Sequence, residues 1–150
     1  MHPFPILYAE DEVHDVLFLQ TVFAQEHVSN PLKIVIDGQQ AIDYLAGSGP
    51  FSDRLNYPLP GLVLLDLKLP KHSGLEVLKW IRERPQFLGL IILIFTSSTQ
   101  PRDIETAYAL GANGYLVKQS NLNELAAMVR ALRDFWLIYN QPLSRSANPD

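Results

Sequence analysis

Short apolar runs alternate with segments of helical periodicity along the whole chain. Each run is brief, contains branched or aromatic residues and is bounded by turn residues, which is typical of strands buried on both faces. The expected strands are residues 5–9, 32–36, 62–65, 90–95 and 114–117. The expected helices are residues 12–27, 38–46, 73–84, 101–110 and 121 to about 139. Residues 47–60 are rich in Gly, Ser, Pro and Asn, and we expect a loop there.

Five consecutive strand-helix units predict an α/β fold with a parallel sheet that carries helices on both faces. Right-handed crossovers leave only a few doubly wound strand orders, and we expect the flavodoxin-like order 2-1-3-4-5. The length of 150 residues suits a single domain. We assign residues 1–140 to that domain and residues 141–150 to a flexible polar tail.

The first and last helices are supported by residues at helical spacing. In the first helix these are Val13, Val16, Leu17 and Gln20 together with residues 23–24. In the last, one stripe is expected to face the sheet, namely Leu125, Val129, Leu132, Trp136 and Tyr139. A second stripe of Ala131, Phe135 and Ile138 is either a broader buried face or a contact surface for a partner.

Polar residues follow the apolar strands at the points where those strands end. Glu10 and Asp11 follow the first strand, Asp66 the third, Thr96 the fourth and Lys118 the fifth. The carboxyl ends of parallel strands share one edge of the sheet, which is where open α/β sheets bind ligands. We therefore expect three carboxylates, a hydroxyl and an ammonium to converge there.

Three carboxylates in one cleft repel each other, by about 4 kcal/mol for a pair at about 4 Å and an effective dielectric of 20. A single lysine cannot neutralise them, so either one carboxylate takes up a proton or a divalent cation binds. The donors are all oxygen, which favours Mg²⁺ over zinc. With such a cation and Lys118 present, the cleft would attract a phosphoryl group, and one carboxylate could act as its nucleophile.

These residues resemble the receiver domains of two-component response regulators. The resemblance spans residue 6 to about 139 and rests on Glu10-Asp11, on Asp66 within the segment 64–70, on Gly74, on Thr96, and on the segments 109–112 and 114–118. The segment from 66 to 82 and the aromatic last helix are most similar to small stand-alone regulators paired with bacterial phytochromes.

The resemblance implies that Asp66 is the phosphoacceptor, assisted by Thr96 and Lys118. It implies that Asp11, Asp66 and the backbone carbonyl of Lys68 ligate Mg²⁺, with Glu10 acting through water. Thr96 and Tyr115 would form a switch pair, the aromatic ring turning inward as the hydroxyl moves toward the phosphoryl group. The implied partners are a sensor histidine kinase, which in this subgroup would be a phytochrome, and a downstream protein. A homodimer through the C-terminal helix is a further expectation.

One position departs from the family pattern. Gln119 follows Lys118, where the family usually has a proline with a cis peptide bond. A cis bond before another residue costs about 2.5–4 kcal/mol, so we expect a trans bond or a strained loop there.

Composition excludes several other classes of protein. The net charge is −4 and no basic cluster is visible, which argues against binding nucleic acid. There is no cysteine, so neither disulfides nor thiolate chemistry are available. Residues 1–5 lack the features of a signal peptide, and the run 90–95 is too short to span a bilayer. We therefore expect a cytoplasmic signalling domain with no membrane contact.

Three alternatives to a phosphorylated switch stay open. An aspartyl-nucleophile phosphatase of the haloacid-dehalogenase type would need a second aspartate two residues after Asp66, where Lys68 stands. A flavin phosphate binder would need Ser, Thr and Gly in the first loop, which is acidic here. A degenerate receiver would act by protein contacts without phosphorylation, and Gln119 is the residue that favours it.

Overall fold

The computed structural model describes residues 3–143. Five parallel strands form one sheet in the order β2-β1-β3-β4-β5. The strands are β1 (Ile6–Ala9), β2 (Leu32–Val35), β3 (Leu62–Leu65), β4 (Ile91–Thr96) and β5 (Gly114–Val117). The strand order and the parallel pairing confirm the predicted flavodoxin-like fold.

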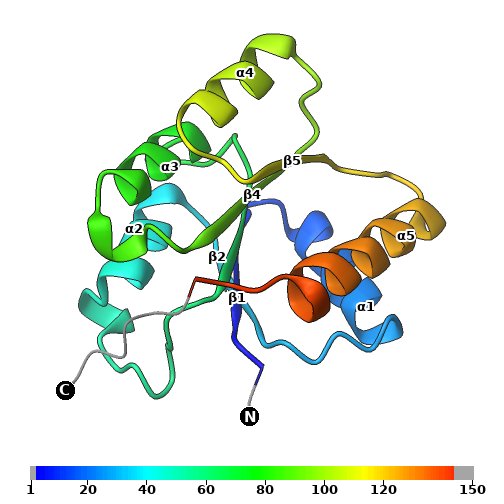
Figure 1. Ribbon diagram of the computed structural model, residues 1–150, viewed down its shortest axis with the longest axis horizontal. Helices are drawn as coiled ribbons and strands as arrows, with labels where there is room; N and C mark the ends of the chain where they lie inside the picture. The colour runs from blue at the N-terminus through cyan, green and yellow to red at the C-terminus, as the bar shows by residue number, and fades with distance from the viewer. Residues whose placement is uncertain (1–2, 144–150) are drawn as a thin grey trace.

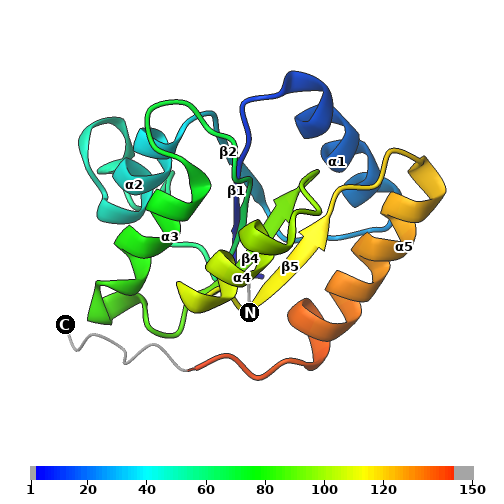
Figure 2. The same cartoon turned by 90° about the horizontal axis from the view of Figure 1, so that it is seen from above.

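Helices cover both faces of this sheet, as Figures 1 and 2 show. The helices are α1 (Val13–Gln25), α2 (Gly38–Ala46), α3 (Gly74–Arg82), α4 (Pro101–Ala109) and α5 (Leu122–Leu132). Two short 3-10 helices, η1 (Gly49–Phe51) and η2 (Pro85–Phe87), follow α2 and α3. One apolar core lies between the sheet and α2, α3 and α4, and the other lies between the sheet and α1 and α5.

The sequence predicted the α3 start correctly, because the capping box is formed. The Ser73 hydroxyl accepts from the Glu76 backbone N–H, and the Glu76 carboxylate accepts from that of Ser73. At α2, the buried Asp37 side chain accepts from the Gln40 backbone N–H at 2.6 Å. These bonds satisfy helix N–H groups that have no partner within the helix, so both helix starts are fixed.

The first helix buries only part of the set of residues with helical spacing. Val13 and Leu17 are 65% and 55% exposed, whereas Leu19, Val22 and Phe23 are buried against the sheet. The helix has apolar residues on more than one side, so spacing alone did not identify the buried face. Its orientation is instead set by packing against β1, β3 and α5.

The end of the last helix also differs from the prediction. Leu125, Val129 and Leu132 are buried as expected, but from Arg133 to Tyr139 the chain forms a π-helix, η3. The wider turn moves later residues off the 3.6-residue stripe, and Tyr139 is 75% exposed rather than facing the sheet. Ala131, Phe135 and Ile138 are exposed, so the second stripe is not a broader buried face.

The segment predicted as a plain loop has a core of its own. The rings of Phe51 and Tyr57 lie within 6 Å of the Tyr44 ring on α2. The Arg54 guanidinium donates to the carbonyl oxygens of Tyr44 and Leu45 at the end of α2, and to that of Tyr57. The loop therefore packs against α2 and caps its C-terminal end.

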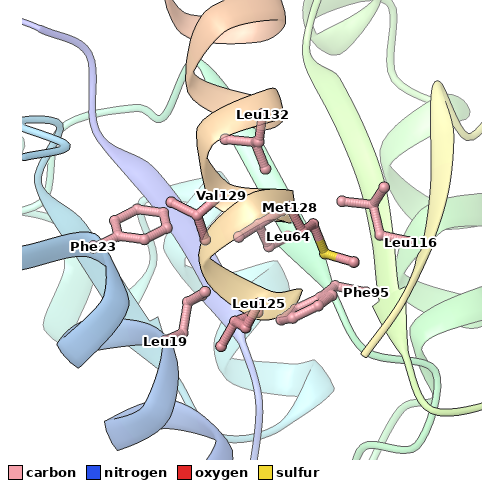
Figure 3. Close-up of a pocket in the computed structure, with 9 residues that line it drawn as sticks. All are labelled: Leu19, Phe23, Leu64, Phe95, Leu116, Leu125, Met128, Val129 and Leu132. Atoms are coloured by element: carbon pink, nitrogen blue, oxygen red, sulfur yellow. The ribbon is translucent and has the colours of Figure 1, made fainter. Parts of the chain in front are cut away.

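Packing between α1, α5 and the sheet leaves one small apolar gap (Figure 3). Its lining comes from Leu19, Phe23, Leu64, Phe95, Leu116, Leu125, Met128, Val129 and Leu132. A small gap lined only by apolar side chains is a packing imperfection rather than a binding site.

Within residues 3–143, no helix combines the length and the apolar content that crossing a bilayer requires. The predicted tail lies outside the described residues from position 144 onward.

Candidate functional site

Polar residues converge at the carboxyl edge of the sheet because the strands are in register. Ala9 pairs with Leu65, which places Glu10 beside Asp66 where β1 and β3 end. The Asp66 backbone N–H donates to the Ala9 carbonyl at 3.2 Å. On the other side, the Lys118 backbone N–H donates to the Thr96 carbonyl at 2.7 Å, which joins the ends of β5 and β4.

The Lys118 ammonium is the centre of this edge. It donates to Glu10 Oε1 at 2.5 Å, to Asp66 Oδ2 at 2.8 Å and to Asp15 Oδ2 at 2.8 Å. The side chains of Glu10 and Asp66 are 1% and 8% exposed, and that of Lys118 is 14% exposed. Burying carboxylates is costly unless they are paired, and Lys118 provides the pairing.

Asp15 is a site residue that the sequence analysis did not identify. It lies in the first turn of α1, and its side chain is 38% exposed. The available signal was its spacing, because Asp15 stands four residues after Asp11, in the first turn of the following helix. That spacing is also common in exposed acidic helix starts, which the helix dipole favours, so it does not single out a functional residue.

Electrostatics within the cluster shift three groups. Burial raises the pKa of Glu10 well above its usual range; the hydrogen bond from Lys118 opposes this shift, and the nearby Asp66 adds to it. Burial also raises the pKa of Tyr8, whose hydroxyl donates to Glu10 Oε1 at 3.2 Å. For Lys118, burial acts to lower the pKa, but hydrogen bonds to Asp15, Asp66 and Glu10 outweigh it and hold the pKa above its ordinary value. The lysine is therefore a permanent cation.

Two residues predicted as metal ligands, Asp11 and Lys68, are exposed beside the Lys118 cluster. Asp11 is exposed and forms no hydrogen bond or ion pair with another described residue. Lys68 is exposed, and its backbone N–H lies 3.4 Å from Asp66 Oδ1. Among residues 3–143, no three His, Cys, Asp or Glu side chains are arranged around a common point that could hold a metal ion. Lys118 is the cation that the carboxylates share in this structure.

The predicted switch residues are linked through one short segment. Thr96 is buried at the end of β4, and its hydroxyl oxygen lies 3.4 Å from the Ser98 backbone N–H. The Tyr115 ring packs against the core under α2, α3 and α4, and its hydroxyl donates to the Ser98 carbonyl at 3.0 Å. The ring is therefore already turned inward here, whereas the resemblance implies that it turns inward only as the Thr96 hydroxyl moves.

Gly74 allows α3 to begin directly against the backbone that follows Asp66. Its N–H donates to the Leu67 carbonyl at 2.8 Å. A Cβ at position 74 would lie 2.0 Å from the Asp66 carbonyl oxygen, so only glycine fits. Gly38 has a similar role, missed from the sequence, because a Cβ there would lie 2.1 Å from the His72 carbonyl oxygen. The loop from Asp66 to Ser73 is thus packed closely against the starts of two helices.

The departure at Gln119 does not move Lys118 away from the cleft. No peptide bond between described residues is cis, so the bond before Gln119 is trans, as predicted. The Gln119 side-chain amide donates to the Val117 carbonyl at 3.0 Å and so spans Lys118. Lys118 reaches all three carboxylates from this loop.

Comparison with known proteins gives consistent matches. The family of the response regulator receiver domain matches residues 6–130. Response regulator Rcp1 of Synechocystis sp. is 36% identical over 135 residues, which is 90% of this chain and 90% of Rcp1. The solved structure of Rcp1 in its Mn²⁺-bound form has a TM-score of 0.84 at 34% identity, covering 95% of this chain and 100% of the other.

Two further solved structures are similar over most of their length. The phosphorylated cyanobacterial phytochrome response regulator RcpA has a TM-score of 0.87 at 32% identity, covering 96% of this chain and 100% of RcpA. Response regulator RPA3017, from red light signalling of R. palustris, has a TM-score of 0.87 at 33% identity, covering 93% of this chain and 99% of the other.

Proposed function

The chain belongs to the response regulator receiver domain family, and on this basis we propose that it is a stand-alone switch phosphorylated on Asp66. The observation that carries the proposal is the contact of Lys118 with two buried strand-end carboxylates, Glu10 and Asp66. A carboxylate that is buried and paired with a lysine is suited to act as a nucleophile toward phosphorus.

The reaction we propose is transfer of a phosphoryl group from a kinase phosphohistidine. A carboxylate oxygen of Asp66 attacks phosphorus, an O–P bond forms and the P–N bond breaks. The electron pair of the broken bond stays on the imidazole nitrogen, which takes up a proton. Lys118 would stabilise the phosphoryl oxygens by its charge, and the Thr96 hydroxyl would donate to one of them.

The oxygen atoms at this edge of the sheet are of the kind that bind a divalent cation. All candidate ligands are oxygens, and the carboxylates of Glu10, Asp15 and Asp66 outnumber the ammonium that they share. We propose that Asp11, Asp66 and the Lys68 carbonyl hold Mg²⁺, with Glu10 acting through water. The Mn²⁺-bound form of Rcp1 supports a divalent site. When bound, the ion would neutralise charge on the phosphoryl oxygens.

Thr96 and Tyr115 would carry the signal from the site to the surface. Both groups contact Ser98, Tyr115 through the Ser98 carbonyl and Thr96 through its N–H. A move of the Thr96 hydroxyl toward a phosphoryl group would shift Ser98, at the start of the connection from β4 to α4. The Ser98 carbonyl that accepts from the Tyr115 hydroxyl would then move as well. The surface formed by α4 and β5 would then be the two-state element.

The donor would be a sensor histidine kinase of the phytochrome type. This rests on the similarity to RcpA, a phytochrome response regulator, and to RPA3017, a regulator in red light signalling. Output would pass through a downstream protein or a second copy of this chain. The exposed apolar stripe of Ala131, Phe135 and Ile138 supports a contact at the C-terminal helix.

The decisive experiment is incubation with acetyl phosphate and Mg²⁺, followed by intact mass measurement. We expect the wild-type chain to gain the mass of one phosphoryl group and Asp66→Asn to gain none. Asp134→Asn, an exposed position far from Asp66 in sequence, controls for the chemical change. Equal gain on Asp66→Asn, or no gain on the wild type, would overturn the proposal; the second result would favour a degenerate receiver.

A further inference from the structure

The three bonds of Lys118 leave its ammonium without a free donor. An ammonium has three N–H groups and no acceptor. Here Glu10, Asp66 and Asp15 each take one, at 2.5, 2.8 and 2.8 Å. Any further anion that Lys118 is to bind must therefore replace one of these carboxylates or lengthen its bond.

Phosphorylation of Asp66 would change the charge balance around Lys118. Before the reaction, three carboxylates surround the ammonium. Afterwards the single charge of Asp66 is replaced by about two charges on the phosphoryl oxygens, so the cluster gains about one negative charge. Loss of one other carboxylate from the cluster would return the balance to its starting value.

Asp15 is the carboxylate that can leave at the least cost. Its side chain is 38% exposed, compared with 1% for Glu10 and 8% for Asp66. A released Asp15 can be hydrated at once, whereas a released Glu10 would be a buried, unpaired charge. Glu10 also accepts from the Tyr8 hydroxyl and from the Glu12 backbone N–H, which further hold it in place.

We propose that Asp15 is a positioning residue that holds Lys118 in the unphosphorylated chain and releases it when Asp66 is phosphorylated. The inference rests on the proposed function of Asp66. Asp15 anchors the lysine from the first turn of α1, while the backbone of Lys118 follows β5. In the phosphorylated chain the ammonium keeps Glu10 and the unesterified oxygen of Asp66, binds a phosphoryl oxygen with its third N–H, and the Asp15 carboxylate turns to solvent. The first turn of α1 therefore changes its exposed charge with the state of Asp66.

The release can be observed in the wild-type chain by NMR. Beryllofluoride with Mg²⁺ serves as the probe of the phosphorylated state, and ¹³C-labelled aspartate reports on the carboxyl carbon of each aspartate. We expect the Asp15 signal to move toward that of a hydrated aspartate when the probe binds, while backbone signals at Asp66 and Thr96 report binding itself. If those backbone signals move and Asp15 does not, the inference is wrong; if none move, the proposed function fails with it.

Variants give a second, independent measurement. Asp15→Asn removes the competing charge, so beryllofluoride should bind more tightly, by roughly three- to tenfold, which is the usual net worth of one hydrogen bond to a partly exposed group. The matched control is Glu12→Gln, which removes a charge three residues away whose side chain does not contact Lys118 or cap α1. Equal affinity changes in both variants, or weaker binding in Asp15→Asn, would overturn the proposal, because a general charge effect or a supporting role for Asp15 would then explain the result.

Discussion

Lys118 and Arg82 are both partly buried cations, but they lie at opposite ends of the parallel strands and have different surroundings. Lys118 follows β5 and meets three carboxylates. Arg82 lies where β4 and β5 begin, and its guanidinium donates to the carbonyl oxygens of Gly111, Phe87 and Leu90 and to the Asn113 side chain, at 2.8–3.1 Å. No carboxylate takes part in that second set of bonds.

The surroundings of each cation determine what it can do. The acceptors around Arg82 are neutral, so they satisfy its N–H groups and attract no other cation. These bonds fix the positions of α3, the connection before β4 and the connection before β5. Burial lowers the pKa of Arg82, yet an arginine stays protonated in proteins. The carboxylates around Lys118 instead exceed its charge, so the cluster can exchange partners. Arg82 holds one edge of the sheet together, and the opposite edge carries the phosphorylation site that we propose.

Removal of the Lys118 ammonium should have the largest effect on the rate of phosphorylation. We expect Lys118→Met to slow phosphorylation by acetyl phosphate about 100-fold, the usual loss when one donor to a developing anionic charge is removed. Intact mass at successive times gives the rate. Lys79→Met, at an exposed lysine in the last turn of α3, should react at the wild-type rate. A wild-type rate in Lys118→Met would contradict the role given to this cluster.

Removal of the structural cation should lower stability instead. Arg82→Met leaves three carbonyls and the Asn113 side chain without their donor, and we expect the free energy of unfolding to fall by about 2–3 kcal/mol. Denaturant titration measures it. Arg84→Met, which loses one backbone bond and the stacking on Trp80, should cost less than about 1 kcal/mol. The folded Arg82→Met protein should be phosphorylated within about twofold of the wild-type rate, and a tenfold loss would show that the two edges are not independent.

The smallest effect, a slight change in melting temperature, is expected at Glu76, an exposed carboxylate that contacts neither Lys118 nor Arg82. Its pKa is lowered by its hydrogen bond to the Ser73 backbone and by His72, so the ionised form is favoured in the folded chain. Stability from this charge is therefore fully present above the unfolded pKa and is lost as pH falls through the folded value. Glu76→Gln keeps a capping oxygen and removes the charge, so its melting temperature should be slightly lower than that of the wild type near neutral pH, and the difference should vanish in acid. A difference that grows in acid would exclude this explanation.

The main elements and the core of the site could be predicted because they depend on local pattern. Buried strands have a simple apolar signature, and a polar residue directly after each strand must lie at one edge of a parallel sheet. That reasoning brought Glu10, Asp66, Thr96 and Lys118 together. It also predicted the start of α3, because a capping box is complete within four residues.

Features that depend on contacts between distant segments were missed or wrong. Asp15 joins the site only because α1 passes beside Lys118, 103 positions away in sequence. The buried face of α1 could not be identified from spacing, because the sheet selects one of several apolar sides. The exposure of Tyr139 was predicted incorrectly, because a π-helix changes the spacing. The network of Arg82 and the aromatic core of residues 47–60 involve ordinary residues whose partners are known only after folding.

The sequence by itself determined which residues stand at the strand ends and hence which chemistry meets at the sheet edge, since periodicity and chain direction suffice for that. Only the tertiary structure decided how charges are shared there and which side of each helix is buried. Those outcomes depend on distance and solvent exposure, which change the energy of a charge by several kcal/mol and are set by packing rather than by neighbours in sequence.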